Sequence, residues 1–246
     1  NVNGTTLTLE GDTGIDVNGD LVVAGLDVLG ATALSGDITS TGDVTLRSAL
    51  TLDGTQTVDG TVVVRNQSVS AGAGNLTALG AITKTGAGTV SLSGQVVEVA
   101  AVSTGRTGDS LTITGVERVK TGALDASGAQ THAGGNVTVS ATPGAGSDPI
   151  QVEIASINAR GGNGLTSATA PEDGRAGGVV SVTGRTIAIG TVNSSGGNAS
   201  AIEVGTVPIS HSGGNAGAIT LNAPTVTMRG SLDASGGAGA SNVSSP

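Results

Sequence analysis

The chain has 246 residues, of which 37% are hydrophobic and 43 are glycine, and it contains no Phe, Tyr, Trp or Cys. Its core must therefore consist of branched aliphatic side chains, without aromatic anchors or disulfides. The formal net charge of −9 and the lack of aromatic stacking platforms argue against nucleic-acid binding, and no apolar run reaches the roughly 20 residues that membrane insertion as a helix requires.

Residues 1–100 consist of short alternating runs separated by tight turns. Gly-Asp, Asn-Gly, Asp-Gly or Ser-Gly pairs separate most of these runs, and alternation over such lengths predicts strands. Two-residue turns of this kind also favour antiparallel hairpins, so an antiparallel sandwich is the alternative to stacked parallel strands here. The runs are residues 7–9, 15–17, 21–23, 26–28, 44–46, 50–52 and 62–64.

A calcium-loop-like pattern lies in this acidic part of the chain. Asp16, Asn18, Asp20 and Asp27 place oxygen side chains at positions 1, 3, 5 and 12 of such a loop. The sixth position holds Leu21 instead of glycine, the last ligand is Asp rather than Glu, and no flanking helices are predicted. A tight Asn-Gly turn between two strands explains the same residues. Calcium is the only cofactor that the sequence suggests.

The second half of the chain repeats a longer sequence motif. Residues 180–197 align with residues 219–237 if one residue is inserted before the last apolar position, and looser copies start at residues 111 and 137. Each copy holds three short alternating runs, and a unit of about 18–20 residues with three strands is typical of one coil of a parallel β-helix. The inward positions are expected to be Val180, Val182, Ile187, Ile189 and Val192, and in the later copy Ile219, Leu221, Val226, Met228 and Leu232.

These patterns predict an all-β chain that forms a single β-solenoid over residues 1–246. Residues 1–100 would form acidic coils with short turns, and residues 101–246 would form coils with longer Gly/Pro-rich loops, one of them spanning residues 161–178. Stacking each coil on its neighbours lets a chain without aromatic residues bury enough aliphatic surface to fold.

Few residues form a pattern that indicates catalysis or ligand binding. The tightest charged cluster consists of Glu172, Asp173 and Arg175, and a solvent-exposed loop is the ordinary explanation for it. His132 and His211 occupy similar sequence contexts, but a metal site needs more ligands than these two. Thr-x-Thr pairs at residues 112–114 and 225–227 resemble those of ice-binding faces, yet they do not recur in every copy. We expect no catalytic residue and no enzymatic activity.

The sequence motifs of the repeats resemble those of filamentous-haemagglutinin-like exoproteins. The resemblance rests on Gly-Asp-Leu-Val-Val (19–23), Gly-Asp-Val-Thr-Leu (42–46), Leu-Asp-Ala-Ser-Gly-Gly (232–237) and four Gly-Gly-Asn turns. Residues 82–94 are similar to the passenger-associated repeat of autotransporters. These similarities imply a right-handed parallel β-helix, an extracellular location on the bacterial outer surface, and adhesive or filament-forming roles.

The expected function is that of a structural or adhesive segment of a secreted bacterial surface protein. It would form a rigid rod for attachment, or assemble with copies of itself into extracellular filaments. Its partners would be other copies end to end, further coils of a longer parent chain, or a host, cell or matrix surface. The alternative is a carbohydrate-binding or carbohydrate-active β-helix protein.

Overall fold

The computed structural model contains β-strands and no helix among the residues that it describes. These residues are 2–11, 15–17, 21–29, 32–34, 38–40, 44–46, 50–53, 67–70, 76–85, 89–142, 151–165, 172–200 and 210–241. No helix able to span a membrane is found in this part of the chain. The strands are β1 (Val2–Glu10), β2 (Ile15–Val17), β3 (Leu21–Leu29), β4 (Thr32–Leu34), β5 (Ile38–Ser40), β6 (Val44–Leu46), β7 (Leu50–Asp53), β8 (Gln67–Ser70), β9 (Leu76–Thr85), β10 (Val90–Ser103), β11 (Leu111–Asp125), β12 (Val137–Ala141), β13 (Val152–Asn158), β14 (Val180–Thr183), β15 (Thr186–Asn193), β16 (Ser210–His211), β17 (Ile219–Asn222), β18 (Thr225–Met228), β19 (Leu232–Asp233) and β20 (Ala240–Ser241).

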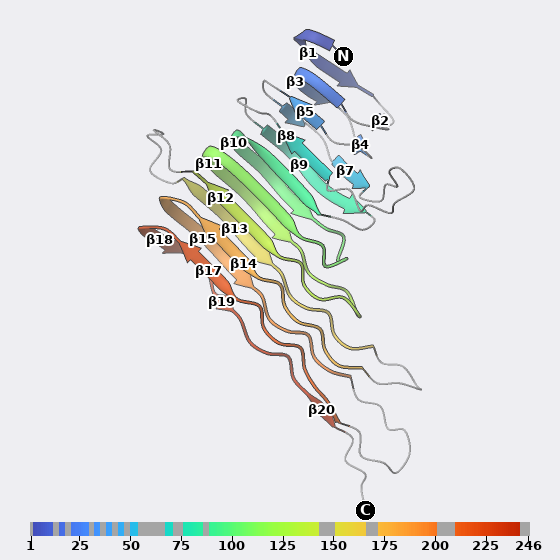
Figure 1. The fold of residues 1–246 in the computed structure, drawn as a ribbon, viewed down its shortest axis with the longest axis vertical. Coiled ribbons are helices and arrows are strands. Elements are labelled where there is room, and N and C mark those ends of the chain that lie inside the picture. Colours follow the sequence, from blue (N-terminus) through green and yellow to red (C-terminus); the bar gives the residue numbers. More distant parts are fainter. Residues whose placement is uncertain are drawn as a thin grey trace, which may run out of the picture.

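All strands except β16 and β20 belong to one 18-stranded sheet, whose pairings are parallel. Figure 1 shows β1 at one end of this array and β17 to β19 at the other. In the first half, β2 pairs with β4, and β3 pairs with β1, β5 and β6. The described strands of residues 1–100 therefore pair in parallel, and the antiparallel alternative is wrong for this described part. Strands β16 and β20 form a separate antiparallel pair.

Aliphatic side chains line up in columns across the paired strands. Val90, Leu111, Val137 and Val180 occupy successive paired positions, and each is fully buried. Alternation in a strand points every second side chain to one face, so strands in register add their apolar residues to the same columns. The columns are Val90, Leu111, Val137, Val180 and Ile219; Leu92, Ile113, Val139, Val182 and Leu221; Leu76, Val97, Val119, Val152, Ile187 and Val226; Ala78, Val99, Thr121, Ile154, Ile189 and Met228; and Ile82, Val102, Leu124, Ile157, Val192 and Leu232.

The alignment of the two longest sequence copies is confirmed. Ile187 pairs with Val226, 39 residues later, whereas Val192 pairs with Leu232, 40 residues later, so the inserted residue lies where the sequence places it. All five inward positions of the earlier copy are fully buried. Those of the later copy are half-buried or exposed, because β17, β18 and β19 have a paired neighbour on one side only among the described residues.

The predicted repeat length holds only near the N-terminus. Leu26 pairs with Val44, 18 residues later, but Leu111 pairs with Val137 after 26 residues and Val180 with Ile219 after 39. A constant unit of 18–20 residues is therefore wrong for the second half. The extra residues leave the sheet after the third run and return before the next strand begins.

The extra residues form a second, glycine-rich body, which we call the glycine layer. It comprises outgoing segments (residues 126–130, 159–165, 194–200 and 234–239) and returning segments (residues 132–136, 172–179 and 211–218). In Figure 1 these segments extend from the strands towards β20. Equivalent segments are joined by backbone hydrogen bonds three residues apart, such as Gly161 N–H to Ser195 O and Gly164 N–H to Asn198 O, both 2.9 Å.

The spacing of three residues is that of a polyproline-II helix, which has three residues per turn and no internal hydrogen bonds. Its N–H groups are thus free to bond neighbouring segments. Outgoing and returning segments are joined in this way, for example by Gly197 N–H to Arg175 O and Gly214 N–H to Gly197 O, both 2.8 Å. The Gly-Gly-Asn phrases at residues 161–163 and 196–198 are therefore packed straight segments, and their interpretation as turns is wrong.

Glycine is needed in this layer for close approach. A Cβ at Gly162 would lie 1.6 Å from the carbonyl oxygen of Ala129, and one at Gly197 would lie 1.8 Å from that of Gly162. Neither glycine has a positive φ, so the constraint is packing against neighbouring backbone rather than a left-handed conformation.

Candidate functional site

Two of the four residues of the calcium candidate lie outside the described residues. These two are Asn18 and Asp20, while Asp16 and Asp27 belong to β2 and β3. No group of three or more metal-ligating side chains occurs in the part of the chain that was described. The calcium site therefore stays a prediction.

The charged cluster around residue 173 joins two rows of the glycine layer. Arg175 Nη2 lies 2.9 Å from Glu172 Oε2, and Asp173 Oδ1 accepts a hydrogen bond of 2.8 Å from the Ser212 N–H. That backbone hydrogen bond, together with the nearby His211, lowers the pKa of Asp173. Asp173 is 62% exposed, as expected of a solvated charged cluster, and its hydrogen bond also connects two neighbouring segments.

The two histidines do not occupy equivalent positions. Val137 and Ile219 both pair with Val180, but His132 precedes the first by five residues and His211 precedes the second by eight. His211 Nδ1 lies 3.3 Å from Asp173 Oδ1, whereas His132 Nδ1 lies 3.2 Å from Thr131 Oγ1. The similar sequence contexts therefore do not place the two histidines in one ladder.

A ladder of Asp and Asn side chains marks the exit from the sheet, and the sequence analysis missed it. Asp125, Asn158, Asn193 and Asp233 are paired in succession. Each Oδ1 accepts a hydrogen bond from the N–H two residues later, an Asx turn that directs the chain into the glycine layer. The donors are Ser127 at 3.0 Å, Arg160 at 3.4 Å, Ser195 at 2.9 Å and Ser235 at 3.0 Å. The recurring Leu-Asp-Ala-Ser-Gly phrase is the signal that could have found it.

Low pH should weaken the hydrogen bonds of Asp233, the last member of this ladder. Hydrogen bonds from the Ser235 hydroxyl and N–H lower the pKa of Asp233. A carboxyl with a lowered folded-state pKa contributes stability that is complete above its unfolded pKa of about 3.9 and is lost as the pH falls through the folded value. Asp233→Asn keeps the Oδ1 acceptor, as Asn193 does in the neighbouring row. We expect the variant to gain stability relative to the original chain as the pH falls below about 4.

Thermal unfolding of both chains from pH 7 down to about pH 2 measures this difference. Melting temperatures that fall in parallel for the two chains would show that the Asp233 carboxylate does not carry the effect.

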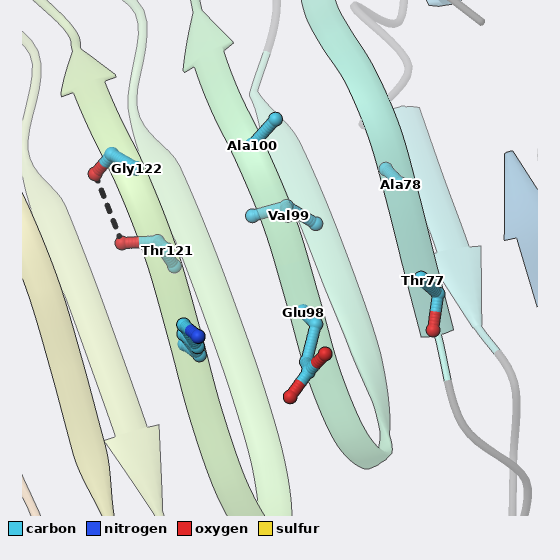
Figure 2. A pocket seen from close by; sticks show the side chains of 8 residues that line it. Thr77, Ala78, Glu98, Val99, Ala100, Thr121 and Gly122 are labelled. Carbon is cyan, nitrogen blue, oxygen red and sulfur yellow. Dashed lines mark hydrogen bonds between the residues drawn. The ribbon is translucent and has the colours of Figure 1, made fainter. Parts of the chain in front are cut away.

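A groove crosses neighbouring strands at the bend after the second run, and both buried and exposed residues line it. Its first part has a volume of about 310 Å³, and Figure 2 shows Ala78, Val99 and Thr121 along it on three neighbouring strands. A second part of about 390 Å³ shares two lining residues with the first and reaches Arg229. The bend itself needs small residues, since a Cβ at Gly122 would lie 1.5 Å from the Ala100 oxygen.

Charged residues border this groove in alternation. Glu98, Lys120 and Glu153 are paired in succession on β10, β11 and β13. Arg118 forms an ion pair with Glu98, and Arg229 Nη1 lies 2.8 Å from Glu153 Oε1. Both carboxylates already have a guanidinium partner, so the groove does not present the free carboxyl pair of a glycosidase. The rim of the groove thus carries paired charges of both signs.

Comparison of the chain with protein-family models, with curated proteins and with solved structures finds no match in any of the three.

Proposed function

We propose that the chain is a structural segment of an extracellular bacterial surface protein. In this proposal it forms one right-handed parallel β-solenoid, and its function is to maintain a rigid rod for attachment to a surface or for assembly into filaments. The observation that carries the proposal is the set of aliphatic columns, which run in register along the sheet and reach an edge where they are uncovered.

The columns account for rigidity. Each strand buries its aliphatic residues against those of the paired strands on either side, so no strand can move without uncovering its neighbours. Strand β11, for example, contributes Leu111, Val119 and Leu124 to three columns at once, and all three are at most 1% exposed. A coil in this proposal is one such set of three runs, followed in the second half by an excursion into the glycine layer.

The uncovered edge accounts for assembly. Val226, Met228 and Leu232 are 38%, 36% and 50% exposed at the end of their columns. An unpaired strand edge offers both backbone hydrogen bonds and apolar surface to another strand. We propose that another strand of the same kind pairs with this edge, supplied by further coils of a longer chain or by a second copy.

Charges at this edge should prevent end-to-end association. In the double variant Val226→Lys, Met228→Lys, contact with another rung would bury two unpaired ammonium groups at a cost of several kcal/mol. Since about 1.4 kcal/mol is tenfold in affinity, association should weaken at least about 100-fold. Sedimentation velocity over a range of concentrations measures this, and electron microscopy shows whether the particles lengthen.

Val116→Lys is the matched control, because Val116 is 42% exposed but lies within β11, away from the edge. We expect this variant to associate like the original chain. An original chain that stays monomeric at every concentration, or a control as impaired as the edge variant, would contradict assembly through this edge.

A second candidate function, carbohydrate binding, is supported by the groove described above. Hydroxyl groups of an extended saccharide could accept from Lys120 and donate to Glu98, at the rim of a groove that runs from strand to strand. A glycan array with the original chain and Lys120→Ala tests it. Binding that is lost in the variant supports the candidate, and an array without signal removes it.

A further inference from the structure

One outer face of the sheet carries two rows of short polar side chains. Thr112 and Thr114 on β11 pair with Thr138 and Ser140 on β12, and the same two positions continue on each neighbouring strand of the ladder β10, β11, β12, β14 and β17. The first row is Ser91, Thr112, Thr138, Ser181 and Thr220. The second row is Ser93, Thr114, Ser140, Thr183 and Asn222.

The pairing of the strands changes the interpretation of the Thr-x-Thr pairs that the sequence alone suggested. Thr-x-Thr pairs do not recur in every copy, but the partners of Thr112 and Thr114 are Ser or Thr on all these strands except at Asn222. The other pair, Thr225 and Thr227, lies on β18 and pairs with Thr186 and Ala188, outside these rows. We call the two rows the hydroxyl face.

The hydroxyl face is uncharged and accessible. None of the paired runs that form it, residues 90–93, 111–114, 137–140, 180–183 and 219–222, contains Asp, Glu, Lys or Arg, although the chain has a net charge of −9. Thr138 and Thr220 are exposed, and the hydroxyls of neighbouring rungs approach one another, with Ser140 Oγ 3.4 Å from Thr114 Oγ1. By contrast, the outer side of the second run presents Glu98, Lys120 and Glu153.

Small side chains continue this face beyond the strands. Asn136, Val179 and Ala218 each lie two residues before a member of the first row, and all three are exposed. Within the described residues the face thus has neither a charged group nor a large ring that would project from it.

We propose that the hydroxyl face binds ice. Pairing in register repeats the hydroxyls about every 4.8 Å across the strands, and alternation repeats them about every 6.7 Å along a strand, so they form a two-dimensional lattice. Fixed hydroxyls can take the place of water molecules in an ordered layer. Charge complementarity favours the same partner, since an uncharged face meets an uncharged lattice and no ion has to lose its hydration shell.

Crystalline neutral polysaccharide is the other uncharged, hydroxylated lattice, and the chain favours it less. Sugar rings in such a surface are held by stacking on aromatic side chains, of which this protein has none. The ice proposal does not depend on end-to-end assembly, because the hydroxyl face lies along the ladder of strands and not at its edge.

Thermal hysteresis and ice-crystal shape, measured with the full 246-residue chain, test the proposal. We expect faceted crystals and a freezing point below the melting point. Thr138→Lys at the centre of the first row should lose most of this hysteresis, because a strongly hydrated ammonium cannot join the lattice. Ser181→Lys, on the neighbouring strand, should have the same effect and serves as a second variant if the first does not fold.

Thr191→Lys is the matched control, since Thr191 is exposed on β15 but lies outside the hydroxyl face. It should retain the hysteresis of the original chain, with melting temperatures confirming that each variant is folded. An original chain with no hysteresis would overturn the proposal. So would equal loss in the face variants and the control, or retention of the protein on crystalline cellulose with exclusion from growing ice.

Discussion

Gly197→Ala is expected to disrupt the glycine layer while leaving the paired strands intact. The added Cβ would lie 1.8 Å from the Gly162 carbonyl oxygen, and backbone on both sides prevents the segment from moving aside. The Gly197 N–H also bonds Arg175 O, and its own carbonyl accepts from the Gly214 N–H, so three segments must separate together. Overpacking costs about 1–3 kcal/mol where a core can adjust, and we expect a loss at or above the upper value.

Hydrogen exchange followed residue by residue measures this effect. Amides in residues 159–165, 172–178 and 211–217 should lose protection, whereas amides of β12 and β14 should keep it. Gly236→Ala is the control: it belongs to the same kind of Gly-Gly phrase, but a Cβ there meets only the Gly214 oxygen, at 3.7 Å. Unchanged protection in Gly197→Ala, or equal loss in both variants, would contradict close packing of the layer.

Val182→Asp should destabilise the whole second half of the chain. Val182 is fully buried and occupies the column between Val139 and Leu221. An isolated carboxylate there has no cation to pair with among the aliphatic side chains of its column, and leaving a charge uncompensated in a protein interior costs about 3–5 kcal/mol. Because neighbouring rungs share this column, the loss should spread to β12 and β17.

Urea unfolding of Val182→Asp and Ser181→Asp provides the comparison. Ser181 precedes Val182 but belongs to the outer side of the strand, where a substitution changes the unfolding free energy by about 0.5 kcal/mol or less. A midpoint that shifts equally in the two variants would show that β14 does not present alternate side chains to the core and to solvent.

The columns could be predicted from the sequence because alternation is local to each strand. Val180, Val182, Ile187, Ile189 and Val192 follow the period of two, and each is fully buried. The position of the inserted residue before Leu232 could also be found, because both copies keep their turn residues. Such features need no knowledge of which segments meet.

The glycine layer could not be predicted in the same way. A Gly-Gly pair serves equally well in a tight turn and in a closely packed straight segment, and only the neighbouring segments decide between them. At Gly162 the deciding neighbour is Ala129, and at Gly197 it is Gly162 itself. The unequal spacing of paired residues, from 17 at Ile15 to 43 at Val137, follows from these long-range contacts.

The candidate sites depended on register for the same reason. The sequence shows isolated Thr and Ser residues, and only the pairing of Thr112 with Thr138 and of Thr138 with Ser181 arranges them in rows. Conversely, His132 and His211 look equivalent in sequence but are separated by register. Composition alone shows that the chain has no Phe, Tyr or Trp and only 10 Lys and Arg residues.

Engineered disulfides test the parallel, in-register arrangement most directly, because the chain has no cysteine of its own. Thr138 and Ser181 are paired on β12 and β14, so Thr138→Cys with Ser181→Cys places the two Cα atoms about 5 Å apart, within the range of a disulfide. Thr138→Cys with Thr183→Cys is out of register by two residues, beyond the limit of about 7 Å. We expect rapid oxidation of the first pair and free thiols in the second, and the reverse result, or equal oxidation of both pairs, would contradict the arrangement.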